Sequence, residues 1–426
     1  MKRSKLFFLD KRHDYCLISE VKIINRILIL ILLMLASSNL YSQQLTESDS
    51  NIDTSNQKDL IDVVRSTLKI TSKNIKRVRG KKFYFSFLPT TSPIPGGGKF
   101  LFTSTSAAFY LGPRKKTNIS SVYFSPYLNF KGRYSLSFRS NIFTSNNLWN
   151  IQGDTRLSLF PEYIFGAKSN GQENNKILIN YKYIRFYQTV LKKVKPYLLA
   201  GVGYNLDYHI NISTVNDSIG FQKFTNYPHG TGENSNSFSS GVTANILYDS
   251  RNNSLNPLPG AYLNLIYRVN PYFLGNGSNA WQSIYLDSRK YISLPGKKRH
   301  LVAIWNYIWT ALSNDVPYLD LPGIGYEPYQ RSGRGIEQNR YRGKSLIYLE
   351  GEYRSDITNN GLLGYVVFAN LNTVASPVNS QFSGLHPAAG AGLRIKFNKR
   401  SNTNIALDFG VSKGNFGYSL NLGEAF

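Results

Sequence analysis

The sequence predicts an all-β protein: a transmembrane antiparallel β-barrel of the outer-membrane type, with about 16 strands. Three observations lead to this prediction. The chain of 426 residues is rich in aromatic residues (14%) and poor in charged ones (18%). Its single long apolar run lies near the N-terminus, which excludes a bundle of membrane helices. Its mean hydropathy is slightly negative (-0.28), so a membrane chain of this kind must hide half of its side chains from lipid.

The N-terminal segment predicts export. Residues 27–36 are ten consecutive apolar residues that follow Lys22 and Arg26. This length suits the apolar core of a secretory signal and is too short to span a membrane, although a buried core helix is an alternative. Small residues follow, so we expect residues 1–42 to be a signal peptide cleaved after Ser42. The remaining chain would carry a net charge of +21 and would contain no cysteine and no methionine.

Residues 43–80 are polar and predict a short periplasmic segment ahead of the barrel. Their one amphipathic stretch, residues 60–68, suggests a short helix or a tether. The segment is too short to bury a core of its own.

From residue 81 to residue 426 the chain alternates apolar and polar residues in segments of about ten. Tyr134, Leu136 and Phe138 illustrate the pattern, and residues 202–212 and 405–412 repeat it. Period two with one apolar face indicates strands that are half exposed to an apolar medium. A soluble β-sandwich is the alternative, but 346 residues without an interior helix exceed what one sandwich needs. At about 22 residues for each strand and its connection, this length predicts about 16 strands.

Two aromatic stretches suit the interfacial girdles of such a barrel. They are residues 83–85 and residues 305–309.

The end of the sequence resembles the β-signal of Gram-negative outer-membrane proteins. In that signal a polar residue is followed by glycine and then by spaced apolar residues, often with a terminal aromatic residue. The residues that fill these positions are Asn415, Gly417, Leu420, Leu422 and Phe426.

Several ordered motifs resemble the Omp85 superfamily, the bacterial surface antigen (D15) barrels that include the BamA/TamA-like proteins. Residues 317–323, 333–336 and 340–354 resemble the sixth extracellular loop and the strand after it. Three further matches are residues 248–260, residues 153–162 and residues 390–410. Each of them is weak alone, but together they follow the order of the family. In this family an Arg-Gly-aromatic loop tip folds back into the lumen. The corresponding motif here is Gly333, Arg334, Gly335 and Ile336, with isoleucine in place of the aromatic residue.

The resemblance implies a non-enzymatic role in outer-membrane protein assembly or in the translocation of protein or lipid. Residues 43–80 leave too little room for a POTRA repeat of about 75 residues, so the sequence resembles a barrel-only branch. The alternative is a plugged pore or a structural surface barrel. Implied partners are outer-membrane lipid and lipopolysaccharide, and client outer-membrane proteins or a periplasmic or membrane partner. The implied location is the bacterial outer membrane.

An arginine drawn into a barrel lumen requires acidic partners, because a guanidinium cannot give up its charge. Glu350 and Glu352 share the polar face of their predicted strand, and Asp408 lies on the polar face of another. We therefore expect Arg334 to bind Glu352 or Asp408 and to hold the loop as a plug, with Glu350 as a further candidate. The alternative is a solvated arginine in an extracellular loop.

The sequence predicts no catalytic residues, no metal site and no cofactor. The histidines after residue 42 are scattered at 209, 229, 300 and 386, and no HExxH, G-x-S-x-G or phosphate-loop pattern is complete. An outer-membrane hydrolase is kept as a third class only because serine and histidine fall on the polar faces of strands. Nucleic acid is not an expected partner. The basic excess instead favours contact with anionic lipid headgroups or lipopolysaccharide phosphates at the rim of the barrel. The candidate clusters are residues 114–116, 192–195 and 297–299, and the sequence leaves open which of them are extracellular and which periplasmic.

Overall fold

The computed structural model describes most of the chain from residue 56 onward. The described ranges are 56–69, 83–93, 99–114, 116–128, 133–159, 161–165, 176–215, 219–251, 253–275, 280–296, 299–328, 330–382 and 384–426. The predicted signal peptide lies outside them, as does much of the segment predicted for residues 43–80. No helix in these ranges is both long enough and apolar enough to cross a membrane.

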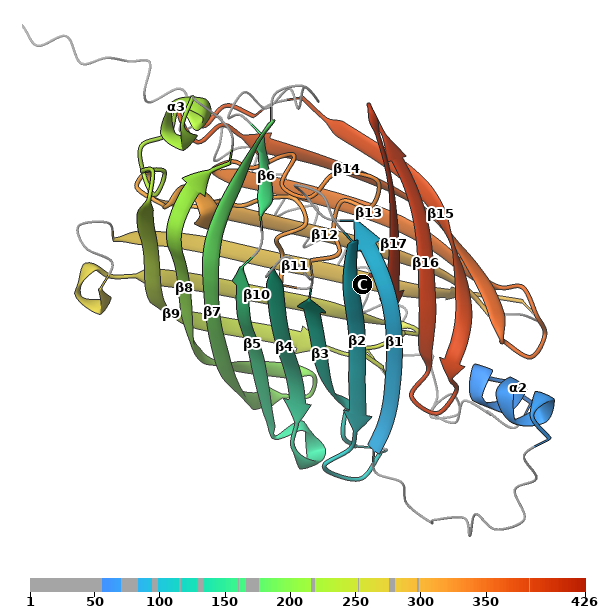
Figure 1. Cartoon of the computed structure of the whole chain (residues 1–426). Helices are drawn as coiled ribbons and strands as arrows, with labels where there is room; N and C mark the ends of the chain where they lie inside the picture. Colours follow the sequence, from blue (N-terminus) through green and yellow to red (C-terminus); the bar gives the residue numbers. More distant parts are fainter. Residues whose placement is uncertain are drawn as a thin grey trace, which may run out of the picture. The chain divides into compact units, whose positions relative to one another are not determined.

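The described strands form an antiparallel barrel of sixteen strands, which confirms the predicted fold class (Figure 1). The first half contains β1 (Phe83–Pro93), β2 (Lys99–Phe109), β3 (Ser120–Leu128), β4 (Tyr134–Phe143), β5 (Trp149–Leu159), β6 (Glu162–Phe165), β7 (Lys176–Lys195), β8 (Leu198–Thr214) and β9 (Ser235–Asp249). The second half contains β10 (Gly260–Asn270), β11 (Trp281–Leu294), β12 (His300–Ala311), β13 (Ser345–Asp356), β14 (Leu363–Ala375), β15 (His386–Asn398), β16 (Thr403–Ser412) and β17 (Asn415–Leu422). Both β5 and β6 pair with β7, so they act as one interrupted strand.

Short helices lie between or before the strands. They are α2 (Leu60–Thr67), α3 (Phe221–Thr225), and the single 3-10 turns η2 (Ser145–Asn147), η3 (Tyr272–Leu274) and η4 (Tyr318–Asp320).

The two ends of the sheet meet in a thin seam. Each strand pairs with the next along the chain, from β1 with β2 to β16 with β17. Among the described residues, β1 and β2 also contact β17, but far less extensively than the sixteen paired strands contact their neighbours. Figure 1 shows β1 beside the strands at the end of the chain. The seam between β1 and β17 is therefore the weakest line in the barrel wall.

The wall is apolar outside and ionic inside. Large apolar side chains are exposed on the outer face, including Tyr134, Leu136 and Phe138 of β4 and Phe409 of β16. Charged side chains are buried on the inner face instead, as for Asp207, which is 1% exposed. This arrangement reverses that of a soluble protein and matches a wall that faces hydrocarbon.

Two details differ from the predicted alternation. A register shift between His209 and Ile212, with Asn211 at φ +56°, turns Ile212 into the interior, although the pattern placed it on the outer face. Trp305 is fully buried and donates to Asp287 over 3.0 Å, so the stretch at 305–309 is not an outer girdle. Its aromatic residues face the lumen, because buried rings and charges fill this side of the barrel.

The helix α2 docks on turns next to the seam. Asp59 caps its first turn by accepting from the backbone nitrogen of Asp62 over 2.9 Å. Lys399, in the β15–β16 turn, donates through its side chain to Asp62 (2.7 Å) and through its backbone to Asp59 (3.0 Å). The backbone nitrogen of Lys58 also donates to Asn360, in the β13–β14 turn. The segment that leads into β1 is thus bound to strands on the β17 side of the seam.

Replacing Lys399 by glutamate should release this helix. The change removes two side-chain bonds and places a third acid beside Asp59 and Asp62, so cleavage within residues 56–82 should become on the order of tenfold faster. Limited proteolysis of the purified protein measures this. Arg400→Glu is the matched control, because it makes the same charge change one residue away, at a side chain that is exposed. Equal cleavage in both variants would contradict the docking role of Lys399.

Candidate functional site: the inward-folded loop and its ionic anchor

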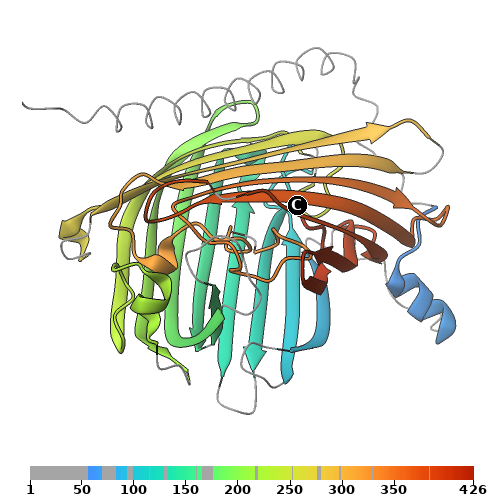
Figure 2. The same cartoon turned by 90° about the horizontal axis from the view of Figure 1, so that it is seen from above.

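The connection between β12 and β13, residues 312–344, folds into the barrel. It links the eleventh and twelfth strands and crosses the interior in the view from above (Figure 2). Its apolar residues are buried in two clusters within the barrel, one that contains Tyr318 and one that contains Ile324. Arg342 organises its first half by donating to the backbone oxygens of Tyr318, Leu319 and Leu321 over 2.8–3.2 Å.

Arg334 lies at the centre of an ionic cluster on the inner wall. Its guanidinium donates to Glu350 and Glu352 of β13, and its Nη1 lies 3.1 Å from Oδ2 of Asp408 on β16. The structure therefore brings together all three acidic residues considered from the sequence. Both glutamates are almost fully buried, so each carboxylate depends on these bonds for compensation.

The backbone of the loop tip is held as firmly as the arginine side chain. Gly333 and Gly335 have φ of +77° and +87°, and the nitrogen of Ile336 donates to the oxygen of Gly333 over 2.7 Å, which closes a tight turn. The hydroxyl of Tyr348 accepts from the nitrogen of Gly333 over 3.0 Å. The side chain of Asn370 donates to the Arg334 oxygen over 2.9 Å.

An aromatic ring does stack on the arginine, but it comes from the wall. The Arg334 guanidinium lies 3.7 Å from the ring centroid of Phe368 on β14. Ile336, which stands at the aromatic position of the motif, is buried in the cluster with Ile324 and Tyr341. The sequence analysis did not identify Phe368. The only signal for it was the alternation on β14, which places its ring on the inner face of the wall.

The loop tip rests against the last two strands. The oxygen of Gly335 accepts from Ser412 (2.7 Å) and from Asn415 (3.0 Å). A Cβ added at Gly335 would lie 2.7 Å from the backbone nitrogen of Val411 and 2.8 Å from the carbonyl carbon of Gly410. The loop backbone therefore touches the backbone of β16, and Asn415 connects it to β17.

The residues after β17 turn inward beneath the same cluster. Gly423 has a φ of +87°, and Glu424 then accepts from Arg394 over 2.7 Å. Phe426 packs beside Trp305, with ring centroids 5.2 Å apart, and its backbone oxygen accepts from Arg354 over 2.9 Å. Of the β-signal residues, Asn415, Gly417, Leu420 and Leu422 thus lie on β17, whereas Phe426 lies inside the barrel.

The loop also holds this inward tail directly. Arg331 donates to the backbone oxygen of Leu422 over 3.0 Å and to that of Glu424. Arg354 bonds Glu352, and Arg394 bonds Asp408 over 2.6 Å, so both arginines join the cluster around Arg334. The loop, β13, β16 and the end of β17 consequently form one connected polar network.

A second ionic network lines the opposite wall. Asp207 of β8 accepts from Arg268 of β10 over 2.7 Å, from Arg185 of β7 over 3.3 Å and from Tyr183 over 2.6 Å. Acid and arginine also stand two residues apart on single strands, which places both on the inner face. Such pairs are Asp154–Arg156 on β5 and Asp287–Arg289 on β11, and Glu352–Arg354 repeats the pattern on β13 in the Arg334 cluster. Asp249, the last residue of β9, pairs in the same way with Arg251 just beyond the strand.

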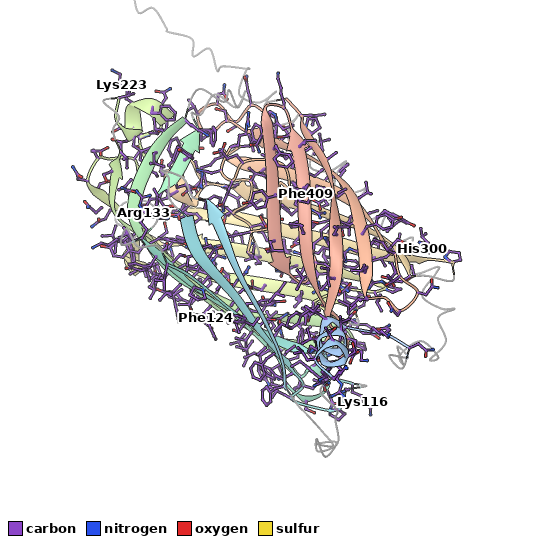
Figure 3. The ribbon with its side chains drawn as sticks, turned by 45° about the vertical axis from the view of Figure 1, so that its right-hand side comes forward. Lys116, Phe124, Arg133, Lys223, His300 and Phe409 are labelled. Carbon is purple, nitrogen blue, oxygen red and sulfur yellow. The ribbon has the colours of Figure 1, made fainter. Side chains whose placement is uncertain are left out.

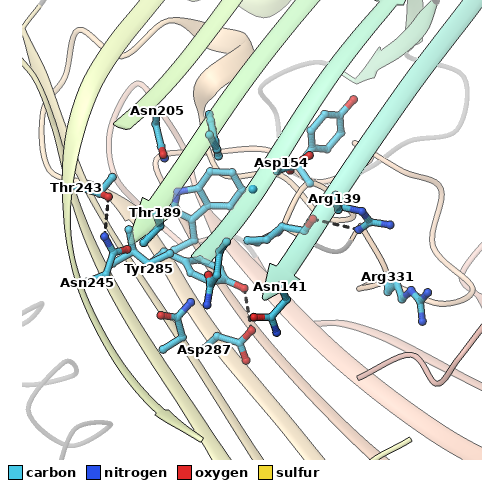
Figure 4. A pocket seen from close by; sticks show the side chains of 18 of the residues that line it. Arg139, Asn141, Asp154, Thr189, Asn205, Thr243, Asn245, Tyr285, Asp287 and Arg331 are labelled. Carbon is cyan, nitrogen blue, oxygen red and sulfur yellow. Dashed lines mark hydrogen bonds between the residues drawn. The ribbon is translucent and has the colours of Figure 1, made fainter. Parts of the chain in front are cut away.

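A cavity of about 210 Å³, lined by both polar and apolar side chains, remains between this wall and the loop (Figure 4). Wall residues Asn141, Asn205 and Asn245 line it, and the loop contributes Arg331 and Asp320. The loop therefore occupies the lumen next to β13–β17, and the cavity lies beside β4–β11.

We expect Asp320 to make the stability of the protein depend on pH. Burial, together with the nearby charge of Asp207, raises the pKa of the Asp320 carboxyl to about 7, and Ser239 donates to it over 2.6 Å. Since an unfolded aspartate has a pKa of about 3.9, the folded protein binds the extra proton between about pH 4 and pH 7. Stability is therefore expected to fall as pH rises through that window.

Asp320→Asn should flatten this dependence, because the amide oxygen still accepts from Ser239 and the side chain no longer ionises. Melting temperatures at pH 5 and pH 8 test this. The variant should have a higher melting temperature than the parent protein at pH 8, and the two melting temperatures should be closer at pH 5. Glu233→Gln, at an exposed site, is the control. A parent protein equally stable at both pH values would contradict the assignment.

The described residues hold no group of three or more His, Cys, Asp or Glu side chains placed to bind a metal ion. His209 is buried and stacks on Tyr183, with ring centroids 4.6 Å apart.

These features define a class of protein: an outer-membrane-type antiparallel barrel of sixteen strands, with the loop between its eleventh and twelfth strands anchored inside the lumen by a buried arginine.

Comparison with solved structures places this fold among known barrels. CdiB from Escherichia coli matches with a TM-score of 0.51 and 11% identity, over 80% of this chain and 61% of that chain. CdiB from Acinetobacter baumannii matches with a TM-score of 0.50 and 12% identity, over 81% and 60%. BamA from Haemophilus ducreyi lacking POTRA domains 1–3 gives a TM-score of 0.48 and 13% identity, over 80% and 69%. No family model and no curated protein matches the sequence.

The chain thus shares its barrel fold with the two CdiB structures. It spans about 60% of the length of the CdiB chains that it matches.

Proposed function

We propose that this protein is an Omp85-type barrel of the outer membrane that assembles outer-membrane proteins or translocates protein or lipid by opening the seam between β1 and β17. The role requires no catalytic residue and no cofactor. Its partners would be outer-membrane lipid, lipopolysaccharide and client proteins, together with a periplasmic or membrane partner.

One observation carries the proposal: the anchored loop bonds directly to the strands at the seam. Arg334 fixes the loop to β13, and the oxygen of Gly335 then accepts from Ser412 and Asn415 at the β16–β17 hairpin. A loop bonded both to β13 and to the seam strand β17 can transmit movement between these two strands. A barrel that is only structural has no need of this connection.

Cysteine crosslinking across the seam tests the proposal. The sequence contains only Cys16, so pairs introduced in residues 83–87 of β1 and 415–422 of β17 can be oxidised selectively. Oxidation should deplete outer-membrane proteins or exported cargo in cells, and reduction should restore them. A crosslink between Leu349 and Leu371, paired on β13 and β14, is the control and should have no effect. Normal assembly and export with the seam locked would overturn the proposal.

A plugged pore is the second candidate function, and the cavity beside the loop favours it. If the loop only blocks conduction, deletion of residues 327–342 should raise single-channel conductance and leave assembly and export in cells unchanged. If the barrel acts by opening its seam, the same deletion should impair assembly or export in cells, because it removes the link between β13 and β17.

A further inference from the structure

Exposed basic side chains gather at one end of the barrel. Strands alternate in direction, so the turns after β2, β7, β11 and β15 all lie at the end where β1 begins and β17 finishes. We call the basic residues described there the basic rim: Arg114, Lys116, Lys192, Lys193, Lys195, Arg299, Lys399 and Arg400. Figure 3 shows Lys116 at this end and Lys223 at the other.

Only part of this charge is compensated locally. Arg299 pairs with Asp356 over 2.9 Å, and Lys399 pairs with Asp62 over 2.7 Å. No ion pair formed by the described residues includes Lys192, Lys195 or Arg400, and all three are exposed. At the other end, exposed Lys223 and Lys413 share the surface with acids such as Glu233, so the positive excess belongs to one end.

Aromatic and apolar side chains place the rim at the depth of lipid headgroups. Lys192 Nζ lies 5.6 Å from the ring centroid of Trp149, and these two residues are paired on β7 and β5. Val194 and Tyr197 are 60% and 57% exposed in the same hairpin. Tryptophan and tyrosine favour the membrane–water interface, so the adjacent ammonium groups lie where phosphate groups are found.

From this arrangement we infer that the basic rim binds anionic glycerophospholipid headgroups in the leaflet at this end, with the β7–β8 hairpin as the principal contact. The inward-folded loop connects strands at the opposite end, and lipopolysaccharide is expected in the leaflet there. This orientation follows from the resemblance of residues 333–336 to the tip of an extracellular loop, and it implies that the rim faces the periplasmic leaflet. The inference depends on the barrel being in a membrane and is independent of what the barrel transports.

The tryptophans provide a direct readout. The sequence has four, at positions 149, 281, 305 and 309. Trp281 and Trp305 are buried, and Trp309 lines the interior cavity, so Trp149 is the tryptophan on the outer wall. Brominated lipid that contacts the β5–β7 rim should quench Trp149 selectively, and Trp149→Phe should abolish that quenching.

The test uses the full chain in phosphatidylcholine vesicles that contain brominated phosphatidylglycerol or brominated phosphatidylcholine. We expect phosphatidylglycerol to quench at lower mole fraction, with a preference that weakens as salt is added. Lys192→Glu/Lys195→Glu should reduce the preference on the order of tenfold. Lys223→Glu/Lys413→Glu makes the same charge change at the other end and should retain it.

Three outcomes would overturn the inference. The first is equal quenching by both lipids in the parent protein. The second is equal loss in the two double variants, which would reflect net charge alone. The third is more effective displacement by unlabelled lipopolysaccharide than by unlabelled phosphatidylglycerol, which would assign the rim to the other leaflet. Far-ultraviolet circular dichroism and heat-modifiability confirm that each variant is folded, so loss of preference reports binding.

Discussion

Arg334→Ala should destabilise the barrel by about 3–5 kcal/mol, the cost typical of removing one partner from a buried ionic cluster. The change leaves Arg354 and Arg394 to compensate four buried acids: Glu350, Glu352, Asp408 and Glu424. Glu350 is the most affected, because its remaining partner is the Tyr348 hydroxyl. Urea unfolding, or the temperature at which the folded band is lost in gel electrophoresis, measures the effect.

Two further variants separate charge from geometry at this site. Arg334→Lys keeps the charge but cannot reach three carboxylates and stack flat on Phe368, so it should recover only part of the loss. Adding Glu350→Gln to Arg334→Ala removes one uncompensated charge and should recover stability as well. If Arg334→Ala were as stable as Arg400→Ala, at an exposed site, the loop anchor would be refuted.

Gly335→Ala should unseat the loop tip and cost about 2–3 kcal/mol. The added Cβ would overlap backbone atoms of Gly410 and Val411, which cannot rotate away, and alanine is strained at a φ of +87°. Gly410→Ala tests the same contact from the strand side, where a Cβ would lie 2.7 Å from the backbone nitrogen of Gly335. Protease cleavage within residues 325–342 should increase in both variants.

Gly351→Ala is the matched control for these substitutions. Gly351 lies on β13 beside Glu350, and a Cβ there would have no atom within 4 Å. Its stability and its protease pattern should equal those of the parent protein. Equal behaviour of the Gly335 and Gly351 variants would show that the loop tip does not require the close approach to β16.

The sequence predicts the fold class well, because the residues of the barrel wall alternate between apolar and polar along each strand. Alternation on each strand is a property of neighbouring residues, and it correctly identifies the outer face of β4 and β16. It fails at Ile212, where a bulge shifts the phase by one residue, and at 305–309, where aromatic residues fill the lumen. Apolar rings can occupy either face of this wall, so composition alone cannot assign them.

The candidate site depends on longer-range information. Arg334 and its acidic neighbours could be proposed from a motif and from strand phase. Phe368, Arg331 and the inward tail could not, because their positions depend on the register between strands and on where the chain turns after Leu422. The Asp207 network could not be anticipated for the same reason, since Arg185 reaches it through the β7–β8 register and Arg268 reaches it from β10, which does not pair with β8. The repeated acid-x-arginine pairs are a further signal in the sequence that would have marked the inner wall.

The docking of α2 sets a distance limit on any opening of the barrel. Its described part ends at Lys69 and β1 begins at Phe83, and a fully extended chain over that interval reaches roughly 50 Å. While Lys399 holds Asp62, the start of β1 can therefore swing away from β17 only within that radius. A wider opening requires α2 to dissociate first from the β15–β16 turn. The largest cargo that can pass should therefore depend on whether the Lys399–Asp62 contact is formed. A variant that releases α2 should admit larger cargo than a variant that keeps it bound.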